Sequence, residues 1–193
     1  MFILDLPLLF GICIAVKPYL LVSEYYGIDG TAKTFADAAS DKGYSNKQWN
    51  SLLLDCAEAL KCLHSKELLH CDLKADNVVI AEQDGLYHAI LVDFGKVREV
   101  TKSKKYSLTL KQQEVYRQRH YHIAPEVVSG ISPHSTESDV YSFGQLISLI
   151  CKYNNVEGLR LLAVKCINGS SQKRPNVNAI IAELNGLRNY EDI

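Results

Sequence analysis

The sequence has few features typical of disulfide or metal sites, of membrane spans or of nucleic-acid binding. Its six cysteines include no C-x-x-C pair, the spacing typical of zinc and redox sites. The apolar stretch at residues 1–16 contains Asp5 and Pro7 and is shorter than the roughly 18 apolar residues of a membrane span. The net charge of −1 excludes strong attraction to nucleic acid or to an anionic membrane. We expect a cytoplasmic protein with reduced thiols, no membrane span and no nucleic-acid partner.

The overall composition is that of an ordinary globular protein. Hydrophobic residues make up 47% of the chain and charged residues 22%, which excludes general disorder and a collagen-like repeat. A chain of 193 residues can bury enough surface to fold without disulfides or a structural metal. We therefore expect the cysteines to act as small buried apolar side chains.

The strongest helical signal begins at Ser45, where Ser45 and Gln48 have the spacing of a capping box. Apolar residues then recur at helical spacing as far as Leu63: Trp49, Leu52, Leu53, Cys56, Ala57 and Leu60. A shorter helix is predicted near 32–39. Further helices are predicted from Thr136 to about 151, around 159–166 and after Pro175.

Strand signals are short and occur in pairs. The runs GICIAV (11–16) and YLLVSEY (19–25) flank Lys17-Pro18 and predict a hairpin. A second pair, 78–81 and 88–92, flanks Asp84-Gly85. Residues 96–123 are polar and predicted to be irregular. The pattern favours an α+β fold, mostly helical with β-hairpins, over a doubly wound sheet.

Several short motifs whose side chains could take part in catalysis follow one another along the chain. They are HCDLKADN at 70–77, DFG at 93–95, APE at 124–126, DVYSFG at 139–144 and Arg174-Pro175. In this order they resemble the motifs of the C-terminal lobe of a eukaryotic-type protein kinase. The resemblance implies that residues 1–193 are a partial protein kinase domain. It places a remnant of the N-lobe β-sheet at 1–22, the hinge at 23–27 and the C-lobe at 28–193.

The resemblance also assigns catalytic roles. Asp72 would be the catalytic base that accepts the proton of the substrate hydroxyl, and Lys74 would place a positive charge beside the transferred phosphoryl group. Asn77 and Asp93 would bind Mg²⁺, which prefers oxygen ligands. The implied cofactors are therefore ATP and Mg²⁺, and the implied partner is a protein substrate.

The segment SEYY is similar to the hinge that binds adenine. By that resemblance Ser23 is the gatekeeper, the backbones of Glu24 and Tyr26 meet adenine, and Val79 forms the floor of the site. An ordinary buried strand edge is the alternative interpretation of this segment.

Other residues of these motifs are expected to be structural. His70 would pack near Phe94, and Asp139 would accept backbone N–H bonds from the catalytic loop. Glu126 and Arg174 are expected to form an ion pair. His120 and His122 could suggest a metal pair, but their place just before APE disfavours it.

The sequence departs from the family pattern in several respects. It contains no G-x-G-x-x-G motif and no equivalent of the strand lysine that binds the phosphates, so these residues alone are expected to be poorly active. Cys71 stands where most kinases have Arg. Residues 154–156 leave no room for the helix that the family usually inserts there. The segment 96–119 has eight Lys or Arg residues against two Glu, a surplus of positive charge that suits either a solvated loop or a basic activation segment.

Two functions from different classes remain open at this point. The first is a protein kinase, with serine/threonine specificity favoured over tyrosine because Lys74 follows Asp-Leu and no tryptophan precedes APE. The second is a non-catalytic binding module derived from a kinase. In either case the hairpin near the N-terminus would expose apolar side chains, and we expect it to offer a surface to a partner protein.

Overall fold

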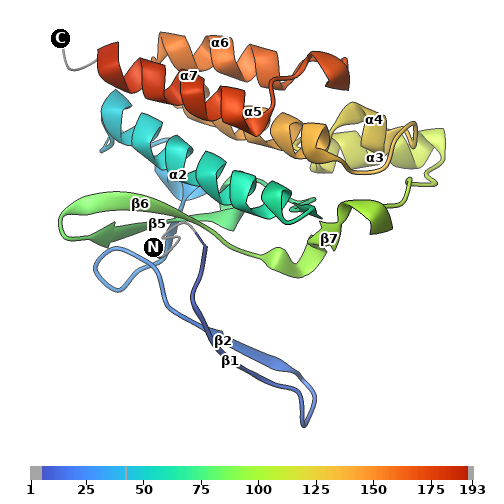
Figure 1. Ribbon diagram of the computed structural model, residues 1–193, viewed down its shortest axis with the longest axis horizontal. Coiled ribbons are helices and arrows are strands. Elements are labelled where there is room, and N and C mark those ends of the chain that lie inside the picture. Colours follow the sequence, from blue (N-terminus) through green and yellow to red (C-terminus); the bar gives the residue numbers. More distant parts are fainter. Residues whose placement is uncertain (1–5, 42, 191–193) are drawn as a thin grey trace.

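The computed structural model describes residues 6–41 and 43–190. Helices and three small antiparallel sheets make up this part of the chain (Figure 1). A long helix, α2 (Asn46–Ser65), lies between a layer of C-terminal helices and the sheet of β5 and β6. The expected α+β architecture, mostly helical with hairpins, is confirmed.

Helix α2 forms because its first turn is capped and one of its faces is apolar. The Ser45 hydroxyl accepts the Gln48 amide at 3.2 Å, and the Gln48 side chain accepts the Ser45 amide at 2.8 Å. The apolar residues predicted at helical spacing are all buried in the main core, from Trp49 to Leu63. Trp49 also makes an edge-to-face contact with Phe35, which begins the short predicted helix α1 (Phe35–Ala38).

The C-terminal layer contains the three helices predicted there, α5 (Thr136–Tyr153), α6 (Glu157–Cys166) and α7 (Val177–Tyr190). The link from α5 to α6 is only a turn, as expected. Gly144 permits the close packing of α6 on α5, since a Cβ there would lie 2.6 Å from the Cβ of Cys166. A short helix, α4 (Pro125–Val128), precedes this layer.

Two of the small sheets position the segments that flank the HCDLKADN and DFG motifs. Strands β5 (Val78–Gln83) and β6 (Leu86–Leu91) pair antiparallel, and the turn at Asp84 and Gly85 has positive φ at both residues. Strand β3 (Lys33–Thr34) extends this sheet beside β5. Strand β4 (Leu68–Leu69) pairs with β7 (Arg98–Glu99), so the segments before HCD and after DFG lie side by side.

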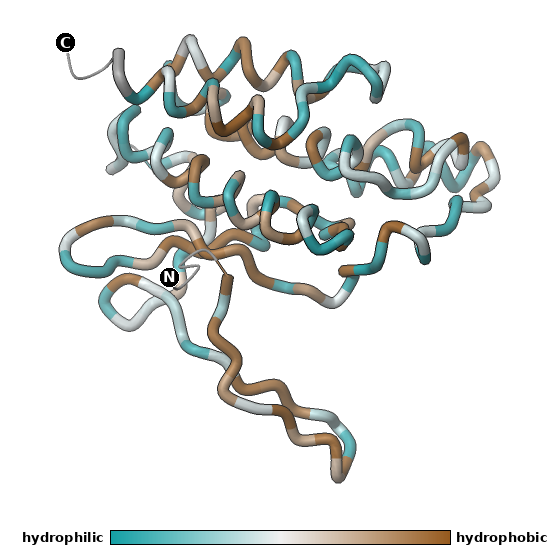
Figure 2. The backbone as a smooth tube through the Cα atoms, in the orientation of Figure 1, coloured by the Kyte–Doolittle hydropathy of each residue, from teal (hydrophilic) through white to brown (hydrophobic). Residues whose placement is uncertain are grey.

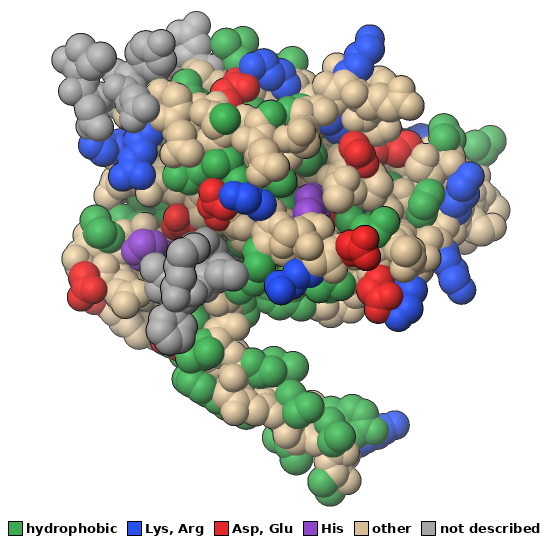
Figure 3. Space-filling view, viewed as in Figure 1, with side chains coloured by type: hydrophobic (Ala, Val, Ile, Leu, Met, Phe, Trp, Pro, Cys, Tyr) green, Lys and Arg blue, Asp and Glu red, His purple; other side chains and the backbone are tan. Residues whose placement is uncertain are grey.

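The predicted N-terminal hairpin consists of β1 (Leu9–Cys13) and β2 (Leu20–Ser23), paired antiparallel. It projects away from the rest of the molecule, and its strands are hydrophobic along their length (Figures 1 and 2). Its large apolar side chains are exposed, for example Val16 at 73% and Leu21 at 71%. Figure 3 shows these side chains gathered on the projecting arm. Among the cysteines, Cys13 lies in this arm and is exposed, contrary to the expectation of buried thiols.

The prediction that residues 96–123 are irregular is wrong. Helix α3 (Leu110–Arg119) occupies their centre and begins with a capping box between Thr109 and Gln112. Short 3-10 turns, Phe94–Lys96 and Val100–Lys102, precede it. Helix α3 was missed because it buries none of its residues and so carries no apolar periodicity.

None of the helices in the described ranges is long and apolar enough to cross a membrane.

Candidate active site

The loop of the HCDLKADN motif is fixed to α5 by one buried carboxylate. Asp139 accepts the backbone N–H groups of His70 and Cys71 at 2.9 and 3.0 Å, as predicted. The ring of His64 on α2 contacts the same carboxylate at 3.0 Å. These bonds hold Cys71 in a left-handed conformation, with φ of 65°. The residue that follows, Asp72, is therefore presented from a rigid turn.

The Asp72 carboxylate is buried and contacts two side chains from the segment that links DFG to APE. Lys96 Nζ lies 2.9 Å and His122 Nε2 lies 3.0 Å from the same oxygen, Oδ1. Burial acts to raise the pKa of Asp72, but the hydrogen bonds from Lys96 and His122 outweigh it. The pKa of Asp72 therefore lies below its ordinary value, and the carboxylate is ionised at neutral pH.

His122 is itself held in place and uncharged at neutral pH. Its ring is buried, and the Ser142 hydroxyl donates to its backbone carbonyl at 2.7 Å. Burial lowers the pKa of His122 more than the neighbouring carboxylate of Asp72 raises it. A neutral His122 can donate one N–H to Asp72, which fixes the orientation of that carboxylate.

Asn77 and Asp93 lie close together because the sheet joins their segments. Val92 N–H donates to the Asn77 carbonyl at 2.9 Å, directly before Asp93. The Asn77 amide nitrogen donates to the Asp72 carbonyl at 2.9 Å, which leaves its side-chain oxygen available. Asp93 is exposed, and one of its carboxylate oxygens accepts the Gly95 amide at 3.2 Å. The bond from Val92 thus brings the segment of Asp93 beside Asn77, whose side chain contacts the Asp72 backbone.

Lys74 follows Asp72 in extended backbone, directly before the 3-10 turn Ala75–Asn77. Its ammonium group makes no ion pair or hydrogen bond within the described residues, and it lies near enough to His122 to lower the pKa of that ring. An unpaired ammonium group near His122 can attract a phosphate group.

The segment expected to bind adenine lies at the base of the projecting hairpin. The Glu24 amide donates to the Leu8 carbonyl at 2.8 Å, and the Tyr26 hydroxyl donates to the Glu24 carboxylate at 2.8 Å. Gly27 links this segment to the sheet through its carbonyl, 3.4 Å from the amide of Glu82 on β5. Val79 lies on β5, half-buried. No contact among the described residues joins Glu24 or Tyr26 to Asp72.

Two further structural expectations, the Glu126–Arg174 ion pair and the packing of His70 near Phe94, are confirmed. Arg174 makes a paired contact with Glu126, at 2.6 and 2.8 Å, and its side chain is fully buried. The ring of His70 packs on Phe94 with 5.7 Å between centroids. In the described ranges, no cluster of His, Cys, Asp and Glu of the size that holds a metal occurs, and His122 contacts Asp72 instead of pairing with His120 on an ion.

Lys96 and His122 were not predicted as site residues. Their positions carried a partial signal, because Lys96 directly follows DFG and His122 lies two residues before APE. Nothing in the sequence, however, indicated that both side chains meet on one oxygen of Asp72.

Comparison with known proteins identifies the family of this chain. The family model of the protein kinase domain matches residues 8–158, more than half of the chain. The chain belongs to the protein kinase family. It is a transferase by family, and the region matched contains Asp72, Asn77 and Asp93.

Several kinases are similar to this kinase domain. A probable serine/threonine-protein kinase of Dictyostelium discoideum is 37% identical over 146 residues, which cover 73% of this chain and 26% of that protein. Wall-associated receptor kinase-like 10 of Arabidopsis thaliana is 25% identical over 95% of this chain and 29% of that protein. A membrane-associated tyrosine- and threonine-specific cdc2-inhibitory kinase of Drosophila melanogaster is 34% identical over 52% of this chain and 17% of that protein. The chain therefore spans about a third or less of the length of these relatives.

Proposed function

We propose that this kinase domain transfers the γ-phosphoryl group of ATP to serine and threonine hydroxyls of a protein substrate. The observation that carries the proposal is the state of Asp72, a buried, ionised carboxylate with two donors on one oxygen. Because Lys96 and His122 both contact Oδ1, the other oxygen is left to accept the proton of a substrate hydroxyl. The names of the Dictyostelium relatives support serine and threonine as acceptors.

Asp72 and Lys74 would have different roles in phosphoryl transfer, the first towards the hydroxyl and the second towards the phosphoryl group. Phosphoryl transfer needs an oriented nucleophile and compensation of negative charge, with little covalent help from the protein. Asp72 orients the hydroxyl and receives its proton as the new P–O bond forms and the bond to the ADP oxygen breaks. The unpaired ammonium group of Lys74 would lie beside the oxygens of the transferred group.

Asn77 and Asp93 are suited to Mg²⁺ because they offer an amide oxygen and a carboxylate, the hard oxygen ligands that this ion prefers. The bound ion would neutralise charge on the phosphates. The backbone bond from Val92 to the Asn77 carbonyl, which joins the segments of these two residues, supports this assignment.

The adenine ring of ATP would form hydrogen bonds with the backbone of residues 23–27. Within the described residues, the Glu24 carbonyl and the Tyr26 amide carry no hydrogen bond, so both remain available to an adenine edge. Val79 would contact the face of the base from the sheet. We propose a remnant of the N-lobe at 1–22, the hinge at 23–27 and the C-lobe at 28–193.

A second function, a non-catalytic binding module, is favoured by one observation. Apolar side chains are exposed along the whole β1–β2 hairpin, including Phe10 at 65% and Ile12 at 61%. Monomeric proteins rarely expose a continuous apolar surface of this kind, so it suits a partner protein or further strands of a sheet. The intact set of Asp72, Lys74, Asn77 and Asp93 favours catalysis as the primary function.

The deciding experiment measures transfer of labelled phosphate from ATP to mixed Ser, Thr and Tyr peptides. We expect the 193-residue chain alone to be very slow, because its sequence holds no glycine-rich loop to position the phosphates. A longer chain that includes such a loop and its lysine should transfer phosphate to Ser and Thr. Asp72→Asn should reduce that rate at least a hundredfold, whereas Asp76→Asn, an exposed neighbour, should leave it unchanged.

Two outcomes would contradict the proposal. If the longer chain binds ATP but transfers nothing, the domain is a binding module. If Tyr peptides are the preferred acceptors, the specificity is wrong although the reaction class stands.

A further inference from the structure

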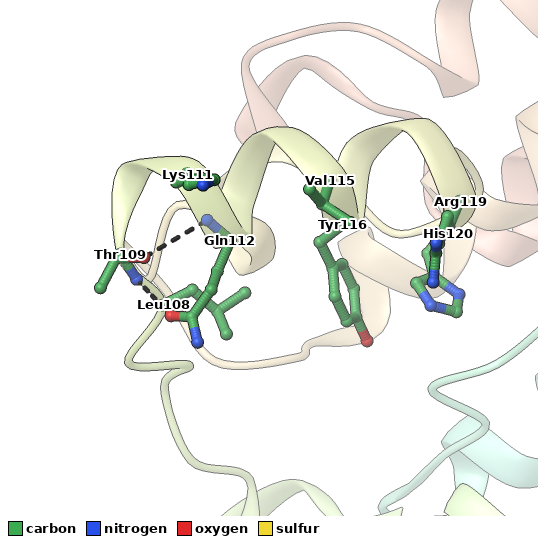
Figure 4. A pocket seen from close by; sticks show the side chains of 8 residues that line it. All are labelled: Leu108, Thr109, Lys111, Gln112, Val115, Tyr116, Arg119 and His120. Carbon is green, nitrogen blue, oxygen red and sulfur yellow. Dashed lines mark hydrogen bonds between the residues drawn. The ribbon is translucent and has the colours of Figure 1, made fainter.

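A groove runs along helix α3, the helix that the sequence did not predict. It has a volume of about 530 Å³ and is lined mainly by this helix (Figure 4). Gln112, Tyr116 and His120 recur every four residues and point to one side, as Figure 4 shows. The adjacent stripe contains Lys111, Val115 and Arg119 at the same spacing. The groove is therefore apolar in its middle and cationic towards both ends.

The two cations of the groove have no partner, whereas two other cations of the same segment are paired. Arg117 on the same helix lies 3.9 Å from Glu114, and Lys102 lies 2.6 Å from Glu99. Lys111 and Arg119, by contrast, make no ion pair or hydrogen bond within the described residues. None of the residues lining the groove is acidic. Two unpaired cations on an apolar wall favour a ligand with carboxylates and an apolar side chain between them.

A series of side-chain contacts connects one end of the groove to Asp72. The ring of Tyr116 packs on His120 at 4.4 Å between centroids, and His120 lies 6.0 Å from His122. His122 in turn contacts the Asp72 carboxylate at 3.0 Å. The His120 end of the groove is therefore the end that lies nearer to Asp72.

We propose that the α3 groove binds the substrate chain beside the phosphorylated residue, and that this kinase prefers substrates with acidic and apolar residues in that flank. The proposal rests on the proposed function, since it places the acceptor hydroxyl at Asp72. Lys111 and Arg119 are eight residues apart, which corresponds to about 12 Å along a helix axis. An extended peptide spans that distance in about four residues. The preferred flank therefore has two carboxylates three or four residues apart and an apolar residue between them, over Val115 and Tyr116.

The surplus of positive charge in the segment 96–119 adds to this preference. Its eight cations and two acids give a net charge of +6, in a chain whose total is −1. This local field would draw an acidic segment towards α3 and would weaken with ionic strength.

Binding can be tested without any catalytic activity. We would measure fluorescence anisotropy of a labelled ten-residue peptide that has two glutamates four residues apart and a leucine between them. Two control peptides replace both glutamates by glutamine or by lysine. We expect the 193-residue chain to bind the acidic peptide at least tenfold more tightly than the glutamine peptide, with the difference shrinking as salt is added.

Two charge-matched variants locate the site. The double change Lys111→Glu with Arg119→Glu should abolish the preference for the acidic peptide and create one for the lysine peptide. Lys66→Glu with Lys173→Glu alters the total charge equally at exposed positions away from α3, and should retain the preference. If the first variant fails to fold, Lys111→Gln with Arg119→Gln removes the charges without reversal.

Equal binding of the acidic and glutamine peptides would overturn the proposal, as would an equal loss in both double variants. A failed phosphate-transfer assay would instead contradict the proposed function and leave the binding result standing.

Discussion

At the scale of single residues, buried polar groups join the activation segment to the helices beneath it. The Tyr106 hydroxyl lies 3.0 Å from His134 Nε2, just before α5, and the two rings also pack edge to face. Burial lowers the pKa of His134 to about 4. His134 is therefore neutral in the folded protein over a range in which the unfolded chain binds a proton.

This predicts a loss of stability in mild acid. Because the pKa of His134 is lower in the folded state, the unfolded state takes up more protons below the ordinary His pKa of about 6.5. The free energy of unfolding should fall from about pH 6.5 down to about pH 4, by roughly 3 kcal/mol in total for this residue. Urea unfolding of the wild type and His134→Gln at several pH values should show a shallower decline in the variant. Parallel curves would contradict the prediction.

A second residue-scale prediction concerns Arg174. Its guanidinium group contacts the Glu126 carboxylate and the Glu137 carbonyl, at 2.9 Å for the latter, with no exposed side-chain surface. Arg174→Ala would leave Glu126 without its partner and should lower the free energy of unfolding by roughly 3–5 kcal/mol.

The control is Lys165→Ala, which removes a partly exposed ion pair with Glu183. That change should cost less than about 1 kcal/mol. Similar melting temperatures for the two variants would show that burial of the Arg174 pair adds nothing.

At the scale of elements, the β1–β2 hairpin differs from the helices in having almost no tertiary support. Its strands pair only with each other in the described part of the chain, and their apolar side chains face solvent. An isolated two-stranded hairpin is marginally stable in water. Helices α2 and α5, by contrast, supply most of their apolar residues to the main core.

We therefore expect the hairpin amides to exchange with deuterium well before those of α2 and α5. Hydrogen exchange followed by mass spectrometry would measure this, because strands that open locally exchange without global unfolding. Equal protection of all three elements would mean that something else covers the hairpin. A longer chain that supplies further strands should raise its protection.

At the scale of the whole molecule, the segment that links DFG to APE is held by contacts at its ends and in its middle. Lys96 and His122 attach its two ends to Asp72, and Tyr106 attaches its middle to His134. Cys71 stands where most kinases have Arg. A thiol carries no positive charge, and burial raises the pKa of Cys71 to about 12, so this side chain is neutral. A phosphate on this segment would lack its usual anchor at the catalytic loop.

We therefore expect a longer, active chain to work without phosphorylation of this segment. The test replaces Thr101, Ser103 and Ser107 by Ala, and Thr109 by Asn so that α3 keeps its N-cap. Initial rates after phosphatase treatment should stay within about tenfold of the wild type, or about 1.4 kcal/mol. A larger loss would show that a phosphate on one of these residues is required.

The sequence by itself determined the elements with a strong local pattern and the order of the motifs. Helix α2 was predictable because its capping box and its apolar face depend only on residues close together in the sequence. Asp72, Asn77 and Asp93 were recognisable from the motifs that contain them. Only the tertiary structure placed Lys96 and His122 on one oxygen of Asp72, because residues 24 and 50 positions away in sequence meet there. The structure also shows helix α3 and its groove. The capping box of α3 at Thr109 and Gln112 is local, but the helix has no buried face to produce apolar periodicity, and a groove depends on how side chains from successive turns align in space.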